Sequence, residues 1–172
     1  MKIKRQFTIR ASAEKLWEIM GIRFADVSDW ASSIDSSQAT SMGIVPIDAP
    51  CGGRICQTSM GSFREKILTY DPHQRIISYD AKGDKMPFFV RSLVNSWVFT
   101  PLSDSRCQVD MSMKISLLPV IGLLMAPLMR MQMGGMIDQV VEELTYFSET
   151  GIPHPRKRDA QLKPQTRAIA EG

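Results

Sequence analysis

Hydrophobic and polar side chains alternate along residues 2–10 and along most of the chain from residue 37 to residue 117. This period of two is typical of strands that bury one face. Turn residues interrupt it at short intervals, for example Gly61-Ser62 and Asp71-Pro72, which favours an antiparallel meander. The pattern predicts strands at residues 2–10, 37–45, 54–60, 63–70, 75–81, 88–100 and 106–117.

The first strand is followed by a segment with helical signals. Ser12 is a good N-cap for a short helix over residues 13–20, and Gly21 is a natural stop. Residues 22–33 carry aromatic side chains among acidic and hydroxyl residues. We expect an irregular or short helical segment there, with its aromatic side chains under the sheet.

A long amphipathic helix is predicted at the C-terminal side of the strands. From Pro127 onwards, apolar residues recur at three- and four-residue steps as far as Phe147, and Gly151 suits the stop position. Proline is tolerated in the first turn of a helix. We therefore expect the helix to begin at Pro127 and residues 117–126 to form a separate short segment. The sequence thus predicts an α+β domain over residues 1–151.

Residues 152–172 differ from this domain in composition. They contain three prolines and no apolar periodicity, so we expect a flexible basic tail. The tail has five basic and two acidic residues, which accounts for the whole net charge of +3. The remaining body is formally neutral, with 16 basic and 16 acidic residues. A neutral body lacks the electrostatic footprint of a nucleic-acid-binding protein, so no nucleic-acid partner is expected.

The residues that commonly bind metals are sparse. The chain has two histidines and three cysteines, with no zinc-ligand or disulfide spacing, so we expect no metal and no cofactor. The N-terminal residues lack the apolar stretch of a signal peptide. The longest uncharged apolar run, residues 117–129, is too short to span a bilayer, which needs about 20 residues. These features predict a soluble cytoplasmic protein, and the oligomeric state is left open.

The parity of the strands indicates which side chains face the covered side of the sheet. The last strand divides cleanly, with Cys107 to Ile115 apolar at alternate positions and polar residues between them. In strand 88–100 both parities are fairly apolar, and we favour the one that contains Trp97 as inward because it carries larger aromatic side chains. In strand 75–81 we favour Tyr79, with Ile77, as inward.

This parity places four polar side chains on the covered face, namely Glu65, Tyr79, Arg91 and Asn95. A buried charge without a partner costs several kcal/mol, so these groups must pair, meet water or meet a ligand. One interpretation is a Glu65–Arg91 ion pair that only satisfies itself. The other is that the polar groups orient a mostly apolar ligand.

Several stretches together resemble the START-like superfamily, also called SRPBCC or polyketide cyclase/dehydrase-like, in its bacterial type. They are KIKRQFTIRASAEKLWEIM, DVSDW, REKILTYDPHQRIISY, SWVFTPLSDSRCQVDMSM and the closing amphipathic helix, and they span residues 2–151. The resemblance implies a helix-grip fold, in which a curved antiparallel sheet of six to seven strands surrounds the C-terminal helix and leaves a cavity for lipids, polyketides or other apolar molecules. It carries no catalytic residue onto this chain.

We therefore expect the protein to bind a small apolar ligand between sheet and helix. The candidate ligand-binding residues are Glu65, Ile67, Tyr79, Arg91, Asn95, Trp97, Met111, Met113, Met129, Met133 and Ile137. The first alternative is a cyclase- or dehydratase-like enzyme in the same cavity, with Glu65 or Tyr79 transferring protons and Arg91 stabilising negative charge. The second is a module that contacts a membrane surface or a partner through residues 117–129, with the basic tail meeting anionic headgroups. For that segment we favour a lid over the cavity.

Overall fold

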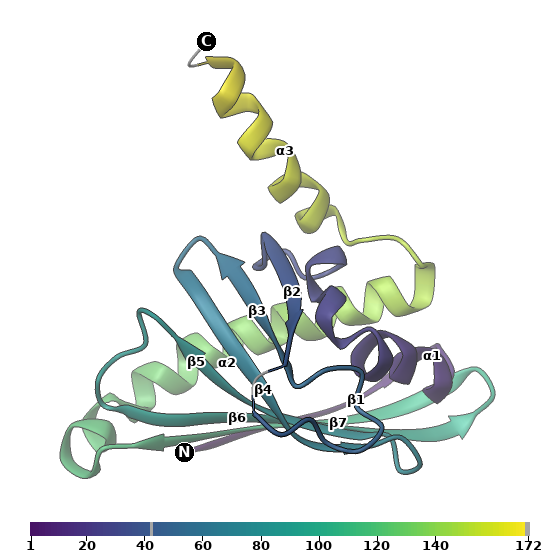
Figure 1. Cartoon of the computed structure of the whole chain (residues 1–172), viewed down its shortest axis with the longest axis horizontal. Helices are drawn as coiled ribbons and strands as arrows, with labels where there is room; N and C mark the ends of the chain where they lie inside the picture. Colours follow the sequence, from purple (N-terminus) through teal and green to yellow (C-terminus); the bar gives the residue numbers. More distant parts are fainter. Residues whose placement is uncertain (42, 171–172) are drawn as a thin grey trace.

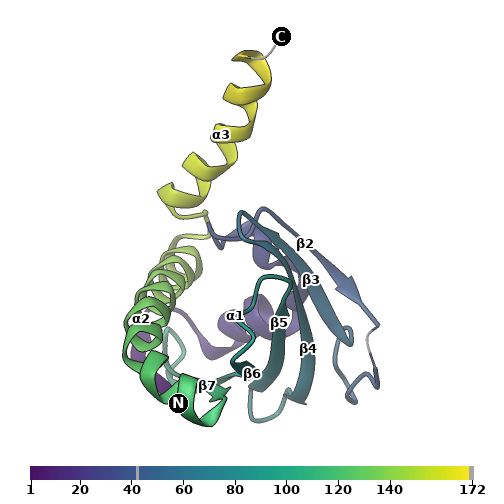
Figure 2. The ribbon, with the colours of Figure 1, turned by 90° about the vertical axis from the view of Figure 1, so that its left-hand side faces the viewer.

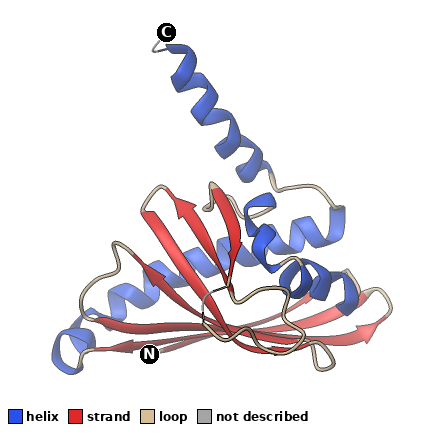
Figure 3. Cartoon of the chain, viewed as in Figure 1, coloured by secondary structure: helices blue, strands red, loops and turns tan. Residues whose placement is uncertain are grey.

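The computed structural model describes residues 1–41 and 43–170, except for the side chains of residue 123 and residues 163–170. Seven strands form one antiparallel sheet in the order β1-β7-β6-β5-β4-β3-β2. The sheet curves around a long helix, α2 (Pro119–Thr150), as Figures 1 and 3 show. The predicted α+β fold with a curved sheet around a C-terminal helix is confirmed. The strands are β1 (Lys2–Ile9), β2 (Ser36–Thr40), β3 (Gly53–Thr58), β4 (Gly61–Asp71), β5 (Ile76–Gly83), β6 (Val90–Ser103) and β7 (Arg106–Leu117).

Short helical segments connect β1 to β2. Helix α1 (Ala13–Trp17) begins after Ser12, whose hydroxyl accepts a hydrogen bond from the Lys15 amide at 3.1 Å, as the capping pattern predicts. A π-helical turn over Glu18–Ile22 and a 3-10 helix over Phe24–Asp29 follow. Figure 2 shows these segments between α2 and the sheet. Phe24 and Trp30 are buried there, so the expected position of the aromatic side chains is correct.

The core lies between the sheet and the helices on its concave side. In β7 the alternate residues from Cys107 to Ile115 are all buried, and in β6 the residues from Leu93 to Phe99 of the Trp97 parity are buried as well. The apolar lining of the concave face is therefore set by strand parity, as the sequence predicts.

Helix α2 begins eight residues earlier than expected and runs through Pro127, so residues 117–126 do not form a separate segment. The proline in the first turn of α2 is Pro119, in keeping with the preference of proline for this position. The first turn is closed by the Gly122 amide, which donates a hydrogen bond to the Leu118 carbonyl oxygen at 2.9 Å. Pro127 lies in the helix interior, where a proline bends a helix. Figure 1 shows the first turns of α2 at an angle to the rest.

Residues 155–170, which the sequence predicts to be part of a flexible tail, form helix α3 (Pro155–Ala170). Gly151 ends α2 at φ 76°, as predicted, and four residues later the chain starts a new helix that projects from the body (Figure 1). The first turn of α3 is held because Arg156 and Lys157 find partners in the domain, and Lys157 is buried. Residue 42 of the predicted strand 37–45 and residues 171–172 of the tail lie outside the described residues.

Candidate functional site

A cavity of about 280 Å³ lies between the concave face of the sheet and helix α2. This is close to the lower end of the usual range for ligand pockets, about 300–1,000 Å³. Its walls come from three places: the strands, the middle of α2, and the segment from Met20 to Ile34 that contains the short helices. Most of its lining is apolar, and the polar exceptions gather on the strand side.

Most of the predicted site residues line this cavity. They are Glu65, Tyr79, Asn95, Trp97, Met111, Met113, Met133 and Ile137. Three do not. Ile67 is buried in the core outside the cavity, Met129 packs against the core from α2, and Arg91 is exposed.

Arg91 was expected to face inward because it shares a parity with Asn95 and Trp97. The pairing of β6 with β7 shifts by one residue between Val90 and Ser92, so Arg91 is the extra residue of a β-bulge. A bulge turns the side chain out of the regular alternation. The predicted Glu65–Arg91 pair is therefore wrong, and Arg91 has no place in the cavity.

The partner of Glu65 is Arg54, from the neighbouring strand β3. The Arg54 Nε donates to the Glu65 Oε2 at 2.5 Å, and the arginine is only 4% exposed. The two residues lie directly opposite each other in the β3–β4 ladder. Gly53, just before Arg54, allows the close approach of the strands, since a Cβ there would lie 2.1 Å from the Glu65 carbonyl oxygen.

Arg54 does not stand out in the sequence, because its cross-strand partner depends on the position of the hairpin turn. A turn at Gly61-Ser62 would have placed Arg54 opposite Thr69. In the structure Thr58 pairs with Gly61, so the loop is Ser59-Met60 and Arg54 meets Glu65. The opposite charges of Arg54 and Glu65 would have been a usable signal, because cross-strand pairs of opposite charge stabilise a register.

Arg54 is enclosed on several sides. Its Nη1 donates to the Phe24 carbonyl oxygen, and its Cζ lies 4.0 Å from the Phe24 ring centroid and 5.4 Å from that of Tyr79. Burial by itself would lower the pKa of Arg54, but the Glu65 charge and hydrogen bond outweigh it, and the pKa is raised. Arg54 is therefore a fixed, fully charged group in the wall of the cavity.

Tyr79 and Trp97 form the next polar contact along the strands. The Trp97 Nε1 donates to the Tyr79 hydroxyl oxygen at 3.3 Å, and both residues are buried. Burial, followed by the nearby Glu65 charge, raises the pKa of Tyr79. The phenol thus keeps its proton at neutral pH, which suits a hydrogen-bond donor and not a general base.

Asn95 is the least satisfied polar side chain of the cavity wall. It lies opposite Tyr79 in the β5–β6 ladder and is 7% exposed. In the part of the chain that the structure describes, its Oδ1 has no hydrogen-bond partner. An unpaired buried carbonyl of this kind costs about 1–3 kcal/mol, so a donor from outside the chain would stabilise it.

The remaining reactive groups near the cavity are cysteine thiols and scattered potential metal ligands. Cys56 lines the cavity, and burial raises the pKa of its thiol to about 11, so it stays protonated at neutral pH. Among the described residues, no three His, Cys, Asp or Glu side chains gather in a way that could hold a metal ion.

The cavity opens where its lining residues become exposed. These are Ser33, Ser59, Met60 and Met136, from the loop after Trp30, the β3–β4 turn and α2. The mouth therefore lies between a helix and two loops, and one of the loops is fixed by the start of α3.

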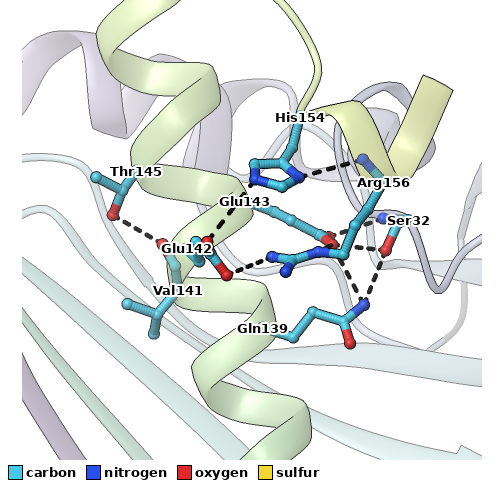
Figure 4. Close-up of polar contacts among 8 residues, drawn as sticks. All are labelled: Ser32, Gln139, Val141, Glu142, Glu143, Thr145, His154 and Arg156. Atoms are coloured by element: carbon cyan, nitrogen blue, oxygen red, sulfur yellow. Dashed lines mark hydrogen bonds and ion pairs between the residues drawn. The ribbon is translucent and has the colours of Figure 1, made fainter. Parts of the chain in front are cut away.

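Figure 4 shows how the loop at the mouth is held. Glu143 of α2 is fully buried and accepts hydrogen bonds from the Ser32 amide at 2.8 Å, the Ser32 hydroxyl at 2.6 Å and the Arg156 Nε at 3.0 Å. One residue further along α3, the Lys157 ammonium donates to the Ile34 carbonyl at 2.6 Å. The residues on both sides of Ser33 are thus tied to the two C-terminal helices.

The comparison with family models identifies the family. The model described as "Polyketide cyclase / dehydrase and lipid transport" matches residues 1–146, and the chain belongs to this family. A comparison with curated proteins gives no match. The family confirms the START-like resemblance seen in the sequence.

Solved structures show the same fold. A START superfamily protein from Mycobacterium smegmatis superposes with a TM-score of 0.68 at 17% identity, over 86% of this chain and 97% of that one. An uncharacterised protein from Bacillus thuringiensis gives 0.63 at 18% identity, over 85% and 97%. Norcoclaurine synthase from Thalictrum flavum, in complex with dopamine and hydroxybenzaldehyde, gives 0.60 at 16% identity, over 83% and 84%. At these identities the likeness concerns the fold alone.

Proposed function

We propose that the cavity binds a small apolar molecule, of lipid, polyketide or aromatic type, that carries at least one hydrogen-bond donor. The observation that carries this proposal is the buried Asn95 Oδ1, which lines the cavity without a partner of its own. A hydroxyl group on the ligand would supply the missing donor, while the methionine and tryptophan walls would cover the rest of the molecule.

The size and charge of the cavity narrow the class of ligand. A volume of about 280 Å³ fits a molecule of one or two rings better than a lipid with two acyl chains. Arg54 and Glu65 neutralise each other, so the wall offers no free charge for an anionic or cationic group. Hydroxybenzaldehyde, one of the two molecules named with norcoclaurine synthase, which has a similar fold, is an uncharged hydroxylated aromatic molecule and is consistent with this class.

Acid–base catalysis in the same cavity stays an alternative hypothesis, but the geometry supports it less. Glu65 is bound in the ion pair with Arg54. The pKa of Tyr79 is raised, so its phenol keeps its proton near neutral pH and does not suit a general base. Binding needs only the groups that the cavity already presents.

The test compares two probes that differ only in the group that Asn95 would recognise, naphthol and methylnaphthalene. Titration calorimetry of the full chain should show naphthol binding about tenfold more tightly, the factor expected for one satisfied buried acceptor. Asn95→Leu, which keeps the shape but removes the amide, should abolish this preference while methylnaphthalene still binds.

Gln38→Leu is the matched control, because it removes an exposed amide from strand β2 outside the cavity wall. It should leave both affinities unchanged. The proposal is rejected if neither probe binds, or if Asn95→Leu retains the preference for naphthol.

A further inference from the structure

One end of the molecule combines exposed apolar side chains with unpaired positive charge. Three segments meet there: residues 1–4, residues 86–92 and residues 112–124. Lys2 of β1 pairs with Lys114 of β7, and the Leu118 amide bonds to the Phe89 carbonyl at 2.8 Å. Figure 1 shows this end at the lower left, where the N-terminus, the start of β6 and the first turns of α2 lie close together, and Figure 2 shows the same proximity.

The apolar part of this end, which we call the apolar tip, consists of Phe88, Val120, Ile121 and Leu124. Phe88 and Leu124 are 76% and 77% exposed, and Val120 is 75% exposed. Single exposed apolar residues are common, but here two segments about 30 residues apart in sequence bring theirs to one place. Clusters of this kind mark surfaces that bind a partner or a lipid phase.

The charge around the apolar tip is of one sign. Residues 1–4, 86–92 and 112–136 contain five basic residues, Lys2, Lys4, Arg91, Lys114 and Arg130, and no aspartate or glutamate. All five side chains are exposed, and none forms an ion pair within the described part of the chain. Elsewhere the exposed arginines are mostly paired, such as Arg23 with Asp26 and Arg64 with Asp84.

This charge pattern distinguishes between two possible binding partners of this end, a second copy of the chain and a lipid bilayer. A second copy of the chain, docked tip to tip, would place five cations against five cations, so self-association through this end is disfavoured. A bilayer with anionic lipids can interact with both parts of this surface. Its acyl chains can contact the apolar tip, and its negative headgroups can attract the long cationic side chains around the tip. None of the helices in residues 1–41 and 43–170 is long and apolar enough to cross a membrane, so the contact would be peripheral.

We propose that this end of the protein docks on anionic lipid membranes, with the apolar tip inserted at the level of the headgroups. Docking does not depend on what the cavity binds. It has a consequence for the cavity, because α2 runs from the apolar tip to the cavity wall at Met133 and Met136. A protein docked in this way holds its cavity next to a lipid phase, where apolar molecules concentrate.

The test is co-sedimentation of the full chain with vesicles of phosphatidylcholine alone or of phosphatidylcholine with an equal amount of phosphatidylglycerol. Binding is expected only with phosphatidylglycerol, and it should weaken as salt is added. Phe88→Ser combined with Leu124→Ser should lower the partition coefficient at least about tenfold, because two apolar side chains lose their burial. Lys2→Gln combined with Lys114→Gln should lower it about tenfold or more.

The matched control is Ile22→Ser combined with Leu102→Ser, which removes two exposed apolar side chains away from the apolar tip, 55% and 52% exposed. It should bind like the unmodified chain, and circular dichroism should show that every variant is folded. If the serine variant of the apolar tip does not fold, the lysine variant decides the question.

Three results would overturn the proposal. The first is that the chain does not bind phosphatidylglycerol vesicles at low salt. The second is that the control variant, the lysine variant and the serine variant of the apolar tip all bind equally. The third is a dimer in sedimentation equilibrium that Phe88→Ser combined with Leu124→Ser converts to a monomer. The last result would assign this end to a second copy of the chain.

Discussion

The two halves of helix α2 are built differently, although they form one continuous element. In residues 137–150 the helix buries Ile137, Glu143, Leu144 and Ser148, and its outer face is tied by ion pairs to other parts of the domain. In residues 119–133, Gly122 is the only described residue that is buried, and exposed Val120, Leu124 and Met131 lie on the outer face.

The two halves of α2 therefore have different structural roles. The second half is anchored as part of the core, because its buried side chains and ion pairs reach β1, the loop at Ser32 and α3. The first half contributes Met133 to the cavity wall, has few buried residues and presents apolar side chains outwards. Local stability follows buried contacts, so the first half is expected to open more easily than the second.

The largest expected effect compares two leucines of the same helix. Leu144→Ala should lower the free energy of unfolding by about 2–5 kcal/mol, because Leu144 is fully buried. Leu124→Ala, at a site 77% exposed, should change it by less than about 0.5 kcal/mol. Urea unfolding of both variants measures the difference. Equal losses would show that the two halves are packed alike.

A smaller effect of the opposite sign is expected at the boundary between the halves. Gly135 is exposed, and a Cβ there would meet nothing within 4 Å. Gly135→Ala should therefore raise the free energy of unfolding by about 0.5–1 kcal/mol, because alanine favours the helix. Gly134→Ala is the neighbouring comparison, where the Cβ would lie 3.5 Å from the Arg5 Nη2 in ordinary contact. A loss of stability in Gly135→Ala would mean that another group covers this face.

The smallest effect is the acid sensitivity of the second half. The Arg5 hydrogen bond lowers the pKa of Asp138, the Arg156 hydrogen bond lowers that of Glu142, and the Arg10 amide and guanidinium lower that of Glu149. A lowered pKa in the folded state gives stability that is fully present above the ordinary carboxyl pKa, about 4, and is lost as pH falls through the lowered values.

Unfolding free energies measured from about pH 6 down to about pH 3 should therefore decrease, and Asp138→Asn should flatten that decrease slightly, since exposed ion pairs contribute little each. The first half contains no acidic residue, so Arg130→Gln should leave the slope unchanged. An equal change of slope in both variants would contradict the assignment of acid sensitivity to the second half.

Strand parity allowed much of the cavity to be predicted from the sequence. The alternation around Met111 and Met113 is unbroken, so their inward position follows from the period of two. Tyr79, Asn95 and Trp97 were placed correctly for the same reason, since β5 and β6 keep a regular register across that region.

The errors arise where pairing between strands, and not the pattern along one strand, decides the position of a residue. Arg91 leaves the parity because β6 has one extra residue relative to β7. The partner of Arg54 depends on where the β3–β4 turn lies. A turn two residues later along the chain would place Arg54 opposite Thr69 instead of Glu65. Neither feature is visible in the alternation of a single strand.

The helices were misjudged for a different reason. The cost of proline in a helix interior predicts a helix start at Pro127, but Pro119 already provides the favourable start. The packing of Met129 and Met133 then continues the helix beyond the bend. Residues 155–170 showed no apolar period, and the start of α3 is fixed by Glu143 and the Ile34 carbonyl, which lie far away in sequence.

The order of the sheet has a consequence for how the chain folds. Among the strands of residues 1–41 and 43–170, β1 is hydrogen-bonded only to β7. Lys2 therefore has no partner in the sheet until Lys114 has been synthesised. Closing a loop of this length carries an entropic cost that must be overcome before the contacts it enables can form. During synthesis, the strand that emerges first is thus the last to be paired, and folding of the whole domain is expected to be slow and to require nearly all of the strands to be present.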